Sequence, residues 1–166
     1  MADRSHAPTW TDQDFESLSW HDNRVQGIQI RNPRDGYDFD LVLEIDHILE
    51  WVQAPGGRYQ FLVAPASLIF HNVGKLAIDV CLSNREDLAI DRIDRTAPPD
   101  EGNHTDPGST SVWRIAMHSF ACRDNSICFE ATGFTQRLTG RAVGPIDSQF
   151  LEEDERRPLS DGTGDP

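Results

Sequence analysis

Apolar and polar residues alternate along residues 37–46, with one interruption at Val42. The odd positions hold Tyr37, Phe39, Leu41, Leu43 and Ile45, and the even positions hold Asp38, Asp40, Val42, Glu44 and Asp46. Successive side chains of an extended chain point to opposite sides, so a period of two is typical of an antiparallel strand with one buried face. The pattern predicts a strand over residues 37–51 that buries its aromatic and aliphatic side and shows four carboxylates on the other.

Further segments have the composition of short strands. They are residues 24–31, 58–64, 67–71, 75–82, 112–122 and 127–137. Turn sequences rich in proline, glycine and aspartate lie at residues 32–36 and 54–57. We expect the last two strands to form a hairpin that turns at Asp124–Asn125, which would pair Cys122 with Ile127. Residues 86–94 fit neither the strand period nor the helix period.

One short helix is expected before the first strand, over residues 11–18. Thr11 can accept a hydrogen bond as the N-cap residue, and Asp14 stands at the third helical position, as in a capping box. With this helix and the predicted strands, the sequence indicates an α+β fold that is mostly β. We expect an antiparallel sheet or sandwich of about seven strands with one short N-terminal helix.

The length of 166 residues suits a single domain. We expect residues 1–9 to be a flexible arm and residues 10–140 to form the β-rich domain. Residues 95–111 lack an apolar run and are rich in proline, glycine and aspartate, which predicts a long loop within that domain. Residues 141–166 have no clear period and many acidic side chains, which is typical of a disordered acidic tail.

The chain is strongly acidic, with 28 Asp and Glu against 15 Lys and Arg and a formal net charge of -13. Such a surface repels a phosphate backbone and attracts a basic protein, so we expect no nucleic-acid partner. The sequence has no apolar run long enough to span a membrane and no signal-peptide pattern near its start. We therefore expect a cytoplasmic protein without a membrane partner.

The residues that usually carry catalysis show no diagnostic arrangement. There is no Gly-x-Ser-x-Gly sequence and no glycine-rich phosphate loop, and Cys128 has no cationic neighbour in the sequence. Three cysteines do not form a disulfide pattern, and Cys81 is expected in the core among its apolar neighbours. We predict no catalytic residue, no resident metal and no cofactor.

The acidic side of the predicted strand at residues 37–51 is the first candidate site. Its carboxylates belong to Asp38, Asp40, Glu44 and Asp46. Alternate residues of a strand lie about 6.5–7 Å apart along its axis, which is too wide for tight Ca²⁺ chelation or a carboxylate pair that shares a proton. A solvated face is one interpretation, a docking surface for a basic partner is the second, and a cation site is the third.

The histidines form a second candidate site. His21 is followed directly by Asp22, and the pair can serve as a metal ligand set, a general base or a polar cap at the start of a strand. His47 and His71 stand near the ends of other predicted strands, so these residues could converge. No histidine or cysteine pair has the spacing that marks zinc sites.

The sequence Leu18-Ser-Trp-His-Asp-Asn-Arg-Val-Gln-Gly-Ile28 carries a family resemblance. It is similar to the opening of small bacterial β-rich proteins without an assigned function, in which a Trp/Phe-His-Asp motif begins the first strand. Residues 41–51 and 61–73 resemble the strands that follow. Some of these proteins are similar to immunity proteins of bacterial toxin systems. The resemblance implies a small acidic cytoplasmic protein that binds a toxin, and it carries over no catalytic residue.

Three functional hypotheses follow. The leading one is a non-enzymatic binding protein, immunity-like, that uses the acidic strand face to bind a basic protein partner. The alternative is a metal-assisted enzyme built around His21, Asp22 and His71. The third is a structural or oligomerising module, because Pro65 marks an edge or a bulge and exposed edge strands can pair between subunits.

Overall fold

The computed structural model describes residues 8–33, 38–83, 87–97 and 110–156. Across these residues the protein is mostly β, with ten strands in one open antiparallel sheet and two short 3-10 turns. The expected antiparallel sheet is confirmed. The α+β class is wrong, because no α-helix forms in the described residues. Tyr37 and most of the predicted arm and of the predicted loop 95–111 lie outside the described residues.

The strands of the sheet differ widely in length. In chain order they are β1 (Thr9–Thr11), β2 (Arg24–Arg31), β3 (Asp40–Gln53), β4 (Tyr59–His71), β5 (Gly74–Asp79), β6 (Leu88–Thr96), β7 (Ser111–His118), β8 (Asn125–Ala131), β9 (Gly133–Leu138) and β10 (Val143–Ile146). Across the sheet they follow the order β1-β9-β4-β3-β2-β6-β7-β8-β5, and β10 pairs with β4. The segment at residues 86–94, which fits neither period, contributes to β6.

The predicted helix is a 3-10 turn, η1 (Asp12–Ser17), with the expected capping box. The hydroxyl of Thr11 accepts a hydrogen bond from the amide of Gln13 at 3.4 Å, and the carboxylate of Asp14 accepts one from the amide of Thr11 at 2.9 Å. The ring of Phe15 lies 5.5 Å from that of Trp113 in the core. These six residues bring the ring of Phe15 to the sheet.

The central strands β3 and β4 form a long hairpin. β4 runs through Pro65 and joins two strands that the sequence analysis separated. On the side away from β3, β4 pairs with β9 from Ala66 onward and with β10 at Val63. Pro65 therefore lies between the stretches that pair with these two strands. A proline cannot donate to a ladder, and this gap is a position where the missing N–H is tolerated.

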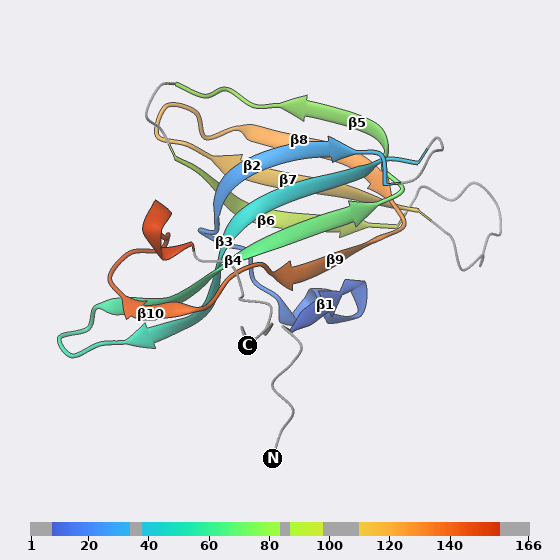
Figure 1. The fold of residues 1–166 in the computed structure, drawn as a ribbon. Coiled ribbons are helices and arrows are strands. Elements are labelled where there is room, and N and C mark those ends of the chain that lie inside the picture. The colour runs from blue at the N-terminus through green and yellow to red at the C-terminus, as the bar shows by residue number, and fades with distance from the viewer. Residues whose placement is uncertain (1–7, 34–37, 84–86, 98–109, 157–166) are drawn as a thin grey trace, which may run out of the picture.

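The sheet curls at a corner where two chain segments turn together. β4 continues into β5 through Asn72, and β8 continues into β9 through Thr132, while β4 pairs with β9 and β5 pairs with β8. The side chain of Asn72 donates to the hydroxyl of Thr132 at 2.9 Å, and the amide of Thr132 donates to the carbonyl of His71 at 3.0 Å. As a result β2, β3, β4 and β9 form a layer in front of β6, β7 and β8 (Figure 1).

The main core lies between these layers and is rich in aromatic rings. The ring of Phe70, on β4, lies 4.8 Å from Phe129 on β8 and 5.1 Å from Trp113 on β7. Phe134 on β9 contacts Trp113 from the side, with ring centroids 5.9 Å apart. Aromatic residues bury large apolar areas and favour such edge-to-face contacts. The core therefore joins the two layers that the corner folds onto each other.

The register predicted for the β7–β8 hairpin is wrong. Ile127 pairs with Ile115 and not with Cys122, because β7 already ends at His118. Asn125 does not lie in the turn. Its buried side chain accepts from the amide of Cys81 at 2.6 Å and donates to the carbonyl of Cys122 at 3.0 Å, so it holds the turn from beneath. Cys81 is exposed, which contradicts its expected place in the core.

A second, smaller core lies at the base of the part of the β3–β4 hairpin that projects beyond the other strands (Figure 1). It contains Ile48, Phe61, Val63 and Leu151, with Val143 and Ile146 packed against it. Leu151 is completely buried. The prediction of a disordered tail over residues 141–166 is therefore wrong for residues 141–156, which form β10 and the turn η2 (Glu153–Glu155). Residues 157–166 lie outside the described residues.

Candidate functional site

Asp46 occupies the centre of a polar site in which it accepts four hydrogen bonds. Its side chain is completely inaccessible to solvent. The guanidinium of Arg156 donates to both of its oxygens, at 3.1 and 2.8 Å. The side-chain amide of Gln26 donates at 2.9 Å and the backbone amide of Leu151 at 3.2 Å. A buried carboxylate is tolerated only when its charge is paired and its oxygens are hydrogen-bonded, and both conditions are met here.

Three separate segments build this site. Gln26 comes from β2, Asp46 from β3, and Leu151 and Arg156 from the chain after β10. Arg156 also donates to the carbonyl of Leu151, which closes the segment into a loop. The hydrogen bond to Asp46 holds the pKa of Arg156 above its usual value. We call residues 147–156 the C-terminal clasp, because Leu151 and Arg156 attach it to the outer side of β3.

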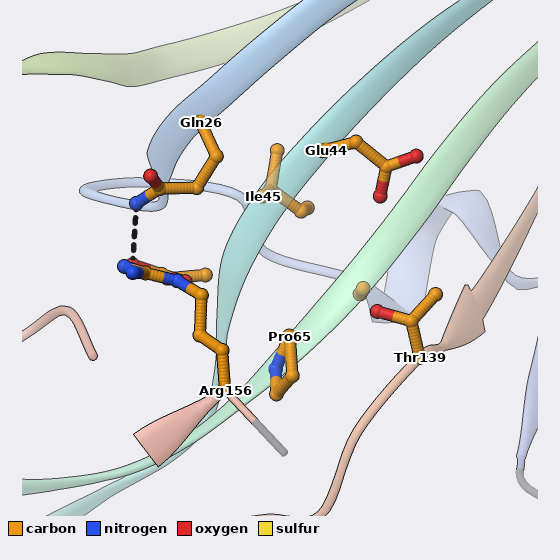
Figure 2. Close-up of a pocket in the computed structure, with 8 residues that line it drawn as sticks. Gln26, Glu44, Ile45, Pro65, Thr139 and Arg156 are labelled. Carbon is orange, nitrogen blue, oxygen red and sulfur yellow. Dashed lines mark hydrogen bonds and ion pairs between the residues drawn. The ribbon is translucent and has the colours of Figure 1, made fainter. Parts of the chain in front are cut away.

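A pocket of about 210 Å³ opens beside the clasp. It is lined by Gln26, Glu44, Ile45, Asp46, Pro65, Ala66, Thr139 and Arg156. Gln26 and Arg156 lie together on one side of it, and Glu44 and Thr139 lie on the other (Figure 2). Because the charge of Asp46 is already matched by Arg156, the pocket offers an incoming group chiefly the carboxylate of Glu44. One oxygen of the Glu44 carboxylate also accepts a hydrogen bond of 2.6 Å from the hydroxyl of Ser67.

The other predicted members of the acidic face lie in different surroundings. Asp40 is mostly buried, with its carboxylate 3.4 Å from the ring of His71. It also accepts from the amide of Asn72 at 3.3 Å. Asp38 is exposed and Glu44 is half-buried. The predicted solvated row of four carboxylates is thus wrong at Asp46 and incomplete at Asp40, because the clasp and the corner cover parts of this face.

His47 lies on the opposite side of β3 from Asp46 and is buried. Its Nδ1 is 2.8 Å from the side-chain nitrogen of Asn23, and its ring meets the ring of Trp10 edge-on at 5.6 Å. Burial lowers the pKa of His47 to about 4. The amide oxygen of Asn23 also accepts from the backbone amide of Ile48 at 3.2 Å. His47 therefore serves as a neutral core side chain that Asn23 holds in place.

His21 and Asp22 form a contact of 3.1 Å in the turn before β2. Asp22 also accepts from Gln149 of the clasp at 2.9 Å, so the pair helps to attach that segment. His71 lies at the far end of β3 and β4, where it contacts Thr135 at 2.9 Å. Asp40, which contacts His71, lies seven residues before His47 on β3. Seven residues span about 23 Å along a strand, so His71 is far from His47.

The histidines therefore do not converge, contrary to the hypothesis of a joint polar site. Among the residues that the structure describes, no three His, Cys, Asp or Glu side chains gather in a geometry suited to a metal ion. The proposed combination of His21, Asp22 and His71 is split between two ends of the sheet, so the geometry gives it no support.

Three polar residues were not predicted from the sequence: Gln26 and Arg156, which bind Asp46, and Asn23, which holds His47. Asn23 directly follows the motif at His21 and Asp22, and its burial could not be read from a polar stretch. Arg156 follows four acidic residues, a composition that suggests disorder. The one available signal was the apolar pair Phe150–Leu151, directly before those acidic residues.

Comparisons with protein-family models, curated proteins and solved structures give no match for this chain. Of the described helical turns, none has the length and apolar character that a bilayer crossing requires.

Proposed function

We propose that this protein is a non-enzymatic binding protein whose acidic surface docks a basic protein partner. The observation that carries the proposal is the C-terminal clasp. Leu151 and Arg156 are attached to β3, and between them Glu152, Glu153 and Asp154 are exposed to solvent. Carboxylates on an anchored backbone lose less conformational entropy on binding than carboxylates on a flexible tail.

The overall charge supports the same proposal. A formal net charge of -13 produces a long-range field that speeds the approach of a cationic protein and repels acidic ones. The resemblance of residues 18–28 to proteins related to toxin-immunity proteins fits a binding role in the cytoplasm. We place the docking surface on the clasp and not on the β3 face, because the carboxylate of Asp46 is already bound by Arg156.

The test begins with identification of the partner. The full chain is used as bait in a lysate of the cells that express it, bound proteins are identified by mass spectrometry, and each is purified for calorimetric titration. We expect a basic partner whose affinity falls steeply when salt rises from about 0.1 M to about 1 M, since the Debye length then shrinks from about 10 Å to about 3 Å.

A charge variant of the clasp locates the surface. Replacing Glu152 and Glu153 by Gln and Asp154 by Asn should weaken binding about tenfold, as three exposed charges each contribute roughly 0.5 kcal/mol. The matched control neutralises three exposed carboxylates elsewhere, with Glu16→Gln, Asp79→Asn and Asp124→Asn. Equal losses in the two variants would place the docking surface elsewhere, and a partner that binds independently of salt would refute the proposal.

A further inference from the structure

The projecting part of β3 has an edge without a strand partner. The pairing of β2 with β3 ends at Arg24 and Asp46, and the side chain of Asn23 then accepts from the amide of Ile48. From Glu50 to Gln53, β3 pairs with β4 on one side, and the described part of the chain places no strand on the other. The outer side of β4 pairs with β10 from Phe61 to Val63, whereas the described residues leave the β3 edge of this hairpin open from Glu50 to Gln53 (Figure 1).

Exposed aromatic rings lie next to this edge. The side chains of Trp51 and Tyr59 are 44% and 53% exposed, although both are large and apolar. Trp51 contacts Phe61 of the second core with ring centroids 4.9 Å apart, and Tyr59 contacts Trp51 at 5.9 Å. Leu151 thus covers the second core but leaves these two rings partly exposed. Tryptophan and tyrosine are the residues that most often anchor protein interfaces.

The charge around the edge favours a cationic occupant. Glu50 is exposed on the edge strand itself. The exposed carboxylates of the clasp follow Leu151, which packs against Ile48 and Phe61 at the base of the same hairpin. A second copy of this chain would bring another -13 charges to the contact, and like charges oppose that pairing.

From these observations we propose that the β3 edge at residues 49–53 binds an extended, basic segment of the partner protein as an added strand. This inference rests on the proposed function and names the binding mode. Main-chain hydrogen bonds supply part of the affinity, as in other cases of strand addition. The partner's apolar side chains contact Trp51 and Tyr59 on the side of the hairpin that carries Leu151, and its cationic side chains face Glu50 on the other side.

A synthetic peptide provides the probe. In it lysine and valine alternate, and its ends are acetylated and amidated. NMR of the full chain should show shifted and exchange-protected backbone amides at residues 49–53 when this peptide is added. A peptide of the same sequence with N-methyl groups along one edge retains the charge and loses the ladder bonds. It should bind at least about tenfold more weakly, because several hydrogen bonds are lost.

Variants test the side chains. Trp51→Ser should weaken binding of the lysine–valine peptide about tenfold, and the matched control Phe120→Ser, at a side chain that is 97% exposed, should leave it unchanged. If Trp51→Ser impairs folding, Glu50→Lys at an exposed position tests the same edge, with Asp79→Lys as its control. Equal binding by each variant and its control would overturn the inference.

The two proposals fail in different ways. Shifts confined to other strands, or equal binding of the N-methylated peptide, would refute strand addition and leave the docking of a basic partner standing. An acidic peptide with glutamate in place of lysine that binds equally well would refute both. Light scattering that shows dimers, together with protection of residues 49–53 in the absence of peptide, would assign the edge to a second copy and overturn the inference.

Discussion

The guanidinium of Arg156 donates two hydrogen bonds to the carboxylate of Asp46, which is completely buried on the outer side of β3. The two residues are 110 positions apart in the chain. This contact, with the burial of Leu151, attaches an acidic segment to the sheet. It gives Asp46, one of the four carboxylates of the predicted acidic face, a structural role.

Replacement of Arg156 by Ala should destabilise the protein by about 2–3 kcal/mol, because a buried charge loses its main partner. The free energy of unfolding is measured by urea denaturation. The control is Arg92→Ala, which removes an exposed arginine near Asp91 and Asp94 and should cost less than about 0.5 kcal/mol. Similar losses in both variants would show that the bond between Arg156 and Asp46 contributes little.

The free energy of unfolding should decrease as the pH falls, because of His47. Burial lowers the pKa of His47 from 6.5 to about 4. Between these pH values the unfolded chain binds a proton at His47, whereas the folded protein does not. Stability is therefore complete above pH 6.5 and declines as the pH falls through this window. The loss is roughly 1 kcal/mol by pH 5.5 and roughly 3 kcal/mol below pH 4.

His47→Gln isolates this contribution from that of the carboxylates. The free energy of unfolding is compared at pH 7 and pH 5 for the parent and the variant. The difference in the free energy of unfolding between parent and variant should be smaller at pH 5 than at pH 7, because only the parent loses the His47 contribution. An NMR titration of His47 with a midpoint at or above 6.5 would contradict the prediction.

The aromatic core should be sensitive to Phe70. This ring joins the layers through Phe129 and Trp113, and Phe70→Ala should cost about 3–5 kcal/mol through lost contacts and a residual cavity. Phe120→Ala makes the same chemical change at an exposed side chain and should change stability by less than about 0.5 kcal/mol. Thermal and urea denaturation measure both. A comparable effect at the two positions would be evidence against the described core.

A buried polar pair offers a coupling test. The indole nitrogen of Trp20 donates to the side-chain oxygen of Gln136 at 2.7 Å. Gln136→Met leaves that donor unsatisfied, and Trp20→Phe leaves the side-chain oxygen of Gln136 without its donor, so each should cost about 1–3 kcal/mol. The double variant should cost about 1 kcal/mol less than the sum, as expected for residues in direct contact. Additive losses in urea denaturation would contradict the bond.

Local pattern accounts for what was predicted correctly. The odd positions Leu41, Leu43 and Ile45 are all buried in the main core, as the period of two in β3 requires. The capping box of Thr11 and Asp14 also forms, since both partners lie within one turn of chain. Such features depend on residues only a few positions apart, so they can be read from the sequence.

The candidate site could not be predicted in the same way. Asp40, Glu44 and Asp46 share one side of β3, yet only Asp46 is completely buried, because the clasp arrives from the end of the chain. The predicted β7–β8 register was wrong because the side chain of Asn125 binds the amide of Cys81, which follows β5, and does not enter the turn. In each case a distant segment determines the surroundings of a residue whose neighbours in sequence suggest something else.

By itself, the sequence determined that the protein is acidic, that it is built of antiparallel strands, and which side of β3 residues 40–46 take. These properties follow from composition and from the geometry of an extended backbone. The tertiary structure alone decided the strand order, the separation of the histidines and the fate of Asp46. Those depend on how the corner at Asn72 and Thr132 brings the layers together and on where the clasp lies, and contacts between such distant segments leave no periodic trace in the chain.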